Sequence, residues 1–71
     1  MDERQKLRIL IPHWIEHNQE HADEFVRFLE SAGDAANDLR QAAEQMASVN
    51  HALAHALEKL GGALAHEHHH P

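Results

Sequence analysis

The side chains best suited to chemistry in this sequence are its histidines. Nine of the 71 residues are histidine, and they fall into three groups: His13, His17 and His21; His51 and His55; and His66, His68, His69 and His70. Imidazole is the commonest metal ligand in proteins, and the free side chain titrates at about pH 6.5. Cysteine is absent, which excludes disulfides and thiolate metal sites. The grouping therefore indicates transition-metal binding through nitrogen ligands.

The first group has the spacing of a helix. His13, His17 and His21 are four residues apart, and each such step advances about 40° around a helix axis, so their rings form one slightly drifting stripe. His17 and His21 make a natural chelating pair, and Glu24 continues the stripe as a candidate third ligand. Nickel, zinc, cobalt and copper(II) all accept nitrogen and carboxylate ligands, so the spacing does not choose among them.

The other two groups differ in character. His51 and His55 repeat the four-residue spacing, and we interpret them as solvated surface residues, with a second chelating pair as the alternative. Residues 63–71 are expected to form a flexible histidine-rich tail, in which His66, His68, His69 and His70 act as a multidentate metal ligand. An expression tag is the competing explanation. The interruption by Glu67 and the terminal Pro71 favour a native tail.

Apolar residues that recur at steps of four and three predict the elements that carry these histidines. The fold class is all-α, an antiparallel two-helix hairpin over residues 1–62, with helices at about 3–31 and 34–60. The expected seam of the first helix is Leu7, Ile11, Trp14, Asn18, His21, Phe25, Phe28 and Ala32, and that of the second is Ala36, Leu39, Ala43, Met46, Asn50, Leu53, Leu57, Leu60 and Leu64. Gly33 suits the left-handed residue of the turn, and Asp34 is expected to cap the second helix. Pro12 either starts the first helix or kinks it, and we favour a kink.

Four polar residues are expected at one level of this hairpin. Residues equidistant from the turn lie opposite each other, which puts His17, Asn18, His21 and Asn50 into one layer between apolar levels. Buried polar groups need partners. Either a hydrogen-bond network fixes register and oligomeric state, or the layer is an internal metal site whose ligands are doubled by a dimer axis.

Size and charge narrow the choice of partners. A chain of this length buries little surface, and its apolar stripes are wider than one helix covers, so we expect a homodimer that forms a four-helix bundle. The formal net charge of -6 disfavours nucleic acid. The longest strongly apolar run, residues 9–11, is too short for a membrane span or a signal peptide, so a cytoplasmic location is expected.

Residues 10–25, LIPHWIEHNQEHADEF, resemble the signature of a family of small helical domains with no established function. Members carry an LPHWIEHNxEHAxEF-like pattern, an alanine- and glutamate-rich helix that ends in Leu-Gly-Gly, and histidine-rich extensions. The resemblance covers residues 7–62. It implies that Pro12, His13, Trp14, His17, Asn18 and His21 belong to a shared pattern, without naming a ligand.

The sequence thus predicts a non-enzymatic protein that buffers, delivers or senses a transition metal, with a metalloprotein client as a candidate partner. The alternative is a non-catalytic dimerisation module whose His/Asn layer specifies pairing. A di-metal enzyme is disfavoured because the Glu-x-x-His pattern of such bundles is missing. No serine or cysteine nucleophile accompanies a base.

Overall fold

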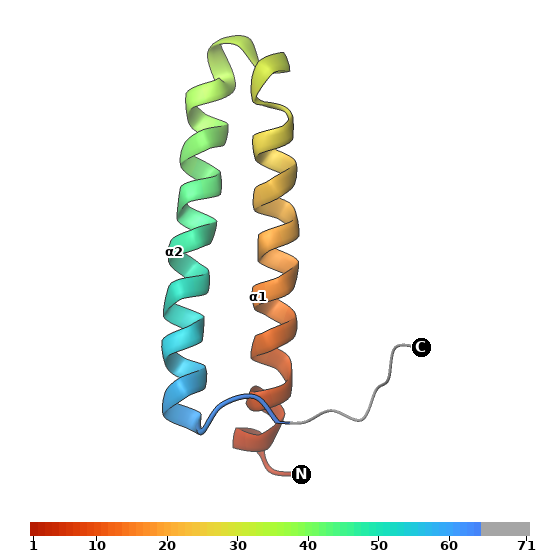
Figure 1. Cartoon of the computed structure of the whole chain (residues 1–71), viewed down its shortest axis with the longest axis vertical. Helices are drawn as coiled ribbons and strands as arrows, with labels where there is room; N and C mark the ends of the chain where they lie inside the picture. Colours follow the sequence, from red (N-terminus) through yellow and green to blue (C-terminus); the bar gives the residue numbers. More distant parts are fainter. Residues whose placement is uncertain (65–71) are drawn as a thin grey trace, which may run out of the picture.

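A computed structural model describes residues 1–64, and all the regular elements in that range are helical. In order they are α1 (Glu3–Arg27), the short 3-10 helices η1 (Leu29–Ser31) and η2 (Gly33–Ala35), and α2 (Ala36–Leu60). The two long helices pack side by side and run antiparallel (Figure 1). The predicted all-α helical hairpin is confirmed. The tail histidines, from His66 onward, lie outside the described residues.

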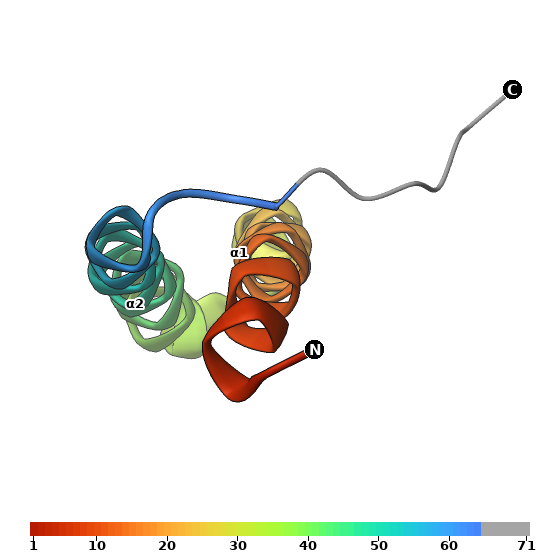
Figure 2. The same cartoon turned by 90° about the horizontal axis from the view of Figure 1, so that it is seen from below.

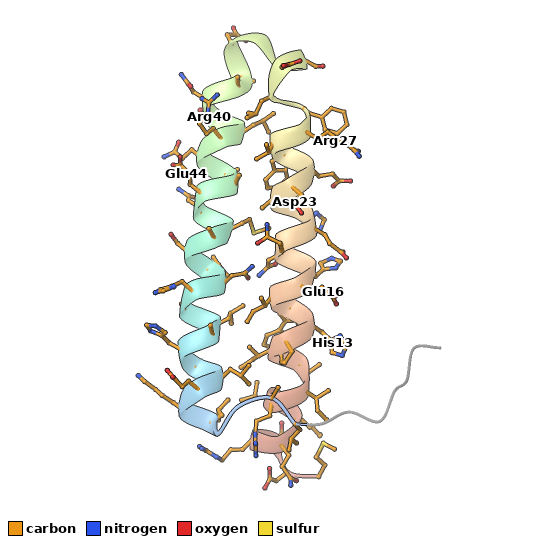
Figure 3. All side chains as sticks on the ribbon, in the orientation of Figure 1. His13, Glu16, Asp23, Arg27, Arg40 and Glu44 are labelled. Atoms are coloured by element: carbon orange, nitrogen blue, oxygen red, sulfur yellow. The ribbon has the colours of Figure 1, made fainter. Side chains whose placement is uncertain are left out.

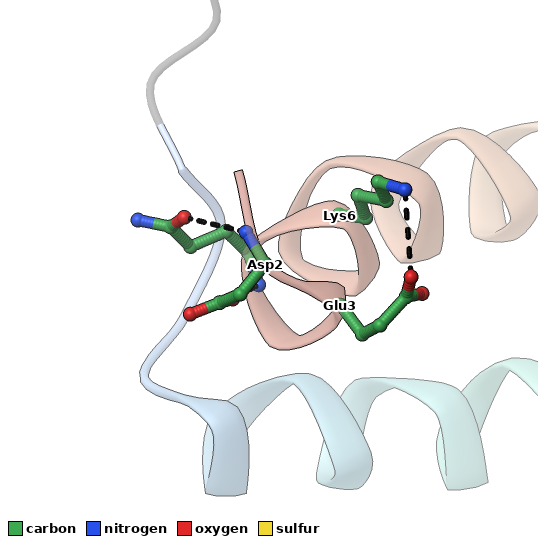
Figure 4. A network of polar contacts seen from close by, with 4 residues as sticks. Asp2, Glu3 and Lys6 are labelled. Carbon is green, nitrogen blue, oxygen red and sulfur yellow. Dashed lines mark hydrogen bonds and ion pairs between the residues drawn. The ribbon is translucent and has the colours of Figure 1, made fainter.

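The first turn of α1 is capped by side chains of its own residues and of Asp2. Asp2 is the N-cap: its Oδ1 accepts from the Gln5 amide at 2.8 Å, and the Asp2 amide donates to Gln5 Oε1 at 3.1 Å. Lys6 lies 3.4 Å from Glu3 Oε2 on the same turn (Figure 4). This capping box satisfies amides that have no partner within the helix, so α1 begins well before Pro12.

Pro12 lies inside α1, which continues past it without a break. Proline has no amide hydrogen, so the carbonyl of Arg8, four residues earlier, loses its helical partner. The amide of Leu64 donates to that carbonyl at 3.3 Å. The proline therefore leaves an acceptor on α1 for the chain that follows α2.

Arg8 also holds this chain with its side chain. Its Nε donates to the Gly62 carbonyl at 2.6 Å and its Nη2 to the Gly61 carbonyl at 3.0 Å. A cation at the carboxyl end of a helix is favourable, because the last carbonyls there lack partners. We call the contacts of Arg8 with Gly61, Gly62 and Leu64 the Arg8 clasp. It draws residues 61–64 across to α1 on one side of the hairpin (Figure 2).

The turn differs in detail from the expected one. The α-helical part of the first helix ends at Arg27, and η1 and η2 follow instead of a continuation to residue 31. Gly33 has the expected left-handed conformation, at φ 58°. The expectation that Asp34 caps α2 is wrong: Ala35 is the N-cap, without a side-chain bond. Two tight turns carry the chain between the helices, and the Ala35 amide donates to the Ala32 carbonyl at 3.0 Å.

The seam of α1 is displaced from the predicted one. Among the described residues only Ile11 and Ala22 are buried, at 3% and 8% exposure. Trp14 and Phe28 were expected in the seam, yet they are 43% and 51% exposed. The observed inner positions are Ile11, Ile15, Asn18, Ala22, Phe25 and Leu29. Three of these positions belong to the predicted seam and three lie one residue further along the chain. Leu7 and Ala32 of the predicted seam are also half-buried.

Within residues 1–64, neither long helix has an apolar stretch sufficient to cross a membrane.

Candidate functional site

His17 and His21 form a close pair on the surface of α1. Their Nε2 atoms lie 3.2 Å apart, and the ring centroids are 4.7 Å apart with the planes at 82°. The side chains are 69% and 45% exposed. The one-turn spacing places both rings on the same side of a rigid helix, and the two nitrogens converge on a point that is open to solvent.

The separation of the two nitrogens suits an ion held between them. With metal–nitrogen distances of about 2.0–2.1 Å and angles of about 90–110°, two imidazole nitrogens on one ion lie about 2.9–3.4 Å apart. The observed 3.2 Å falls in this range. Without an ion, one ring can donate its Nε2 hydrogen to the other, depending on the tautomers. As ligands, the pair would fill two positions of a four-coordinate ion.

A carboxylate lies near the other nitrogen of each ring. Glu20 Oε1 is 4.0 Å from His17 Nδ1, and Glu24 Oε1 is 3.8 Å from His21 Nδ1. Histidines that bind metal through Nε2 commonly direct Nδ1 toward a carboxylate, which fixes the tautomer and orientation of the ring. Glu24, expected as a ligand, lies near the His21 nitrogen that faces away from His17. Sequence reasoning did not assign Glu20 a role, although its His-x-x-Glu spacing from His17 was visible.

The other candidate ligands of the helices are His13 on α1 and His51 and His55 on α2. His13 projects from α1 on the side away from α2 (Figure 3). His51 and His55 are exposed on α2 with ring centroids 4.6 Å apart, and His55 borders a shallow depression beside Glu58 and Gly62. Within residues 1–64, no set of three or more histidine, aspartate or glutamate side chains is arranged to hold an ion.

The expected polar layer divides into two parts. Asn18 Nδ2 donates to Asn50 Oδ1 at 3.0 Å across the two helices, and Asn50 Nδ2 donates to the Ile15 carbonyl at 3.0 Å. These partly buried amides form the hydrogen-bond network that one interpretation predicted. His17 and His21 lie beside the seam instead of inside it. The expectation that His21 occupies the seam is therefore wrong, because Ala22 takes that position.

Fold and site together define a small helical-hairpin domain with a surface histidine pair. Residues 7–60 match the family model of DUF8180, a domain of unknown function, and the chain belongs to this family. The match agrees with the resemblance to small helical domains whose function is not established. Comparison with curated proteins and with solved structures found no match.

Proposed function

We propose that this protein binds a transition-metal ion through His17 and His21 and serves in metal buffering, delivery or sensing. The observation that carries the proposal is the 3.2 Å separation of the two Nε2 atoms. The carboxylates of Glu20 and Glu24, near the two Nδ1 atoms, give it further support. Nickel, zinc, cobalt and copper(II) fit this donor set. The proposed setting is the cytoplasm, and the proposed role is not catalytic.

An exposed pair of ligands suits transfer of an ion more than permanent storage. Two imidazoles leave coordination positions for water, for other ligands of this chain or for a client metalloprotein. The sequence adds four histidines at 66, 68, 69 and 70, which supply further imidazoles. The proposed division of labour is capture by the tail and retention by the helical pair. Protons compete for the same lone pairs, so acid weakens the binding.

A homodimer forms part of the same proposal. Leu10, Trp14, Val26, Phe28 and Val49 are between 41% and 52% exposed, and no large side chain among the described residues is fully buried. Apolar surface left in water favours association.

The second candidate function is a pairing module without a metal. Its supporting observation is the Asn18–Asn50 hydrogen bond, because an amide pair inside an apolar seam fixes register and partner choice. Under this alternative, His17 and His21 only donate and accept one hydrogen bond.

Calorimetric titration separates the two candidates. The starting protein is the full-length chain carrying His66→Asn, His68→Asn, His69→Asn and His70→Asn, stripped of metal and titrated with nickel, zinc, cobalt and copper(II). We expect one saturable site, weakened at least about tenfold by His17→Ala or His21→Ala because a chelating ligand is lost. The matched control is His51→Ala, which removes a histidine of equal spacing on α2. No binding by the starting protein, or equal losses in both variants, would favour the pairing module.

A further inference from the structure

One side of α1 carries a stripe that is turned away from the direction of the seam. It advances by steps of four and three, and we call it the lateral α1 stripe: Leu10, Trp14, His17, His21, Glu24 and Phe28. At about 100° per residue, the centre of the stripe points about 100° away from the direction of the seam. The two ends of the stripe are exposed and apolar, and its middle holds the histidine pair.

The residues of the lateral α1 stripe are spaced symmetrically about residue 19. Leu10 and Phe28 are equally distant from residue 19, and so are Trp14 and Glu24, and so are His17 and His21. An antiparallel copy of the same helix would therefore meet it residue for residue, as an interface with two-fold symmetry requires.

A second stripe lies on the same side of the hairpin. Ala42, Val49 and Ala56 follow one another at seven-residue steps on α2, about a quarter turn from its seam. We call them the lateral α2 stripe, and its centre is Val49, which is 46% exposed. The Arg8 clasp holds residues 61–64 against the opposite side of the hairpin (Figure 2). The side that carries the two lateral stripes is left uncovered by that segment.

The two stripes share one centre. The hydrogen bond between Asn18 and Asn50 puts these residues at the same level of the antiparallel helices. Residue 19 of α1 is consequently level with Val49 of α2. A single two-fold axis that runs across this face from α1 to α2, perpendicular to both helices, can relate both stripes to the same stripes of a second chain.

From this coincidence we infer that a second copy of the chain packs on the lateral face, with α1 against α1 and α2 against α2, both antiparallel. The axis passes between His17 and His21, so the two copies bring four imidazoles together at one point. The inference rests on the proposed function and deepens it: the binding site is a four-histidine centre shared by two chains, incomplete in one. Four nitrogen ligands complete the coordination sphere of a tetrahedral ion.

The size of the face fits a stable dimer. Each helix has 25 residues and is about 37 Å long, and two helices at a spacing of about 10 Å present about 750 Å². A standard interface buries about 800 Å² per partner. Alanines at two of the three lateral α2 positions permit close approach of the two α2 helices.

Charge makes this dimer dependent on the ion. Glu20 and Glu24 of both copies would gather around the axis, and their mutual repulsion opposes association. A divalent cation held by the four histidines offsets this repulsion. Association and metal binding should therefore strengthen each other.

The test compares two valines of similar exposure on opposite sides of the hairpin. Val49 lies at the proposed axis and Val26 lies away from the lateral face, and they are 46% and 52% exposed. In the full-length protein with its tail histidines changed to asparagine, we expect a zinc-dependent dimer with one zinc ion per two chains. Val49→Glu should give a monomer that binds zinc at least about tenfold more weakly, although both histidines remain. Val26→Glu should behave as the parent.

A disulfide assay is independent of how well Val49→Glu folds. The chain has no cysteine, so Val49→Cys introduces a single thiol at the axis. We expect rapid oxidation to a covalent dimer that retains zinc, while Val26→Cys oxidises slowly. Light scattering and zinc stoichiometry then decide. A monomer with one zinc ion per chain would overturn the shared centre and the homodimer, and would leave the proposed metal binding by His17 and His21 intact. A dimer that Val49→Glu disrupts but that binds no zinc would overturn both the proposed function and the four-histidine centre.

Discussion

A carboxylate lies near the Nδ1 atom of each ring, on the side away from the Nε2 atoms of His17 and His21. The nearest carboxylate to His21 Nδ1 belongs to Glu24, at 3.8 Å. A carboxylate there makes the imidazole a better ligand, because it favours the tautomer whose Nε2 carries the free lone pair. We therefore propose that Glu24 acts on a bound ion through His21 and not as a ligand.

This role gives a prediction for Glu24→Gln. We expect zinc affinity of the tail-substituted protein to fall about tenfold, as is usual when an outer-shell partner is lost. Calorimetry gives the affinity, and Glu44→Gln is the control, since Glu44 projects from α2 away from α1 (Figure 3). We expect His21→Ala to cost more affinity than Glu24→Gln, and equal losses in the two variants would show that Glu24 is itself a ligand. Equal affinities in Glu24→Gln and Glu44→Gln would leave the carboxylate without a role.

At the residue scale the sequence predicted the proximity of the two imidazoles and missed their exposure. The four-residue spacing of His17 and His21 was sufficient to predict two neighbouring rings on one side of a helix. Their exposure could not be read in the same way, because it depends on which flank of the helix meets α2. His21 was assigned to the seam, whereas its side chain is 45% exposed.

At the scale of elements, two frames of the same helix competed for the seam. Trp14, His21 and Phe28 form one, and Ile15, Ala22 and Leu29 form the other, while Ile11, Asn18 and Phe25 belong to both. Hydrophobic periodicity favoured the frame with the larger aromatic residues. The structure uses the other, in which the small Ala22 is buried at 8% exposure. Packing shape made this choice, and a sequence pattern does not encode shape.

The amide pair in that seam carries a stability prediction. Asn50→Ala should lower the free energy of unfolding by about 1–3 kcal/mol, because the Asn18 amide and the Ile15 carbonyl then lose their partner in a partly buried site. The double variant Asn18→Leu, Asn50→Leu should be more stable than Asn50→Ala and close to the parent, since it leaves no side-chain amide unpaired and removes from the Ile15 carbonyl only the donor that Asn50→Ala also removes. Urea denaturation measures both. A double variant with a lower free energy of unfolding than Asn50→Ala would show that the amides stabilise the seam in their own right.

Pro12 gives a second prediction for an element. Pro12→Ala restores an amide that can donate to the Arg8 carbonyl, so α1 should gain stability while Leu64 loses its acceptor. We expect a higher melting temperature together with faster hydrogen exchange at the Leu64 amide. The amide of Gly62, which donates to the Leu57 carbonyl at 2.9 Å, is the internal control and should exchange as before. Unchanged exchange at Leu64 would mean that proline is not what frees the carbonyl.

On the scale of the whole molecule, two helices with two buried residues have little core of their own. Heptad spacing and the Gly33 turn were sufficient to predict the helical hairpin, because both signals are local. The side on which residues 61–64 return to α1 could not be predicted, since the Arg8 clasp joins residues 54 positions apart. Likewise, the finding that Val49 lies at the same height along the hairpin as the histidine pair could not be predicted without the register of α1 against α2.

If association completes this core, stability should depend on concentration. Dilution lowers the melting temperature of a dimer and leaves that of a monomer unchanged. We expect the melting temperature followed by circular dichroism to fall by several degrees over a hundredfold dilution with zinc present. The Val49→Glu variant should melt at one temperature throughout. A parent protein that also melts independently of concentration would be stable as a single hairpin.

The Arg8 clasp has a consequence for the order in which the chain assembles. Contacts near Gly33 close short loops, whereas the contact between Arg8 and Gly62 joins residues 54 positions apart. Because short loops close at a lower entropic cost, we expect folding to begin at the turn and to form the Arg8 clasp last. Unfolding should begin where folding ends. Three hydrogen bonds then set how often the free ends separate. That local opening should occur more often than breakage of the Asn18–Asn50 hydrogen bond. The part of the hairpin that carries the histidine pair should therefore stay closed while the ends fray.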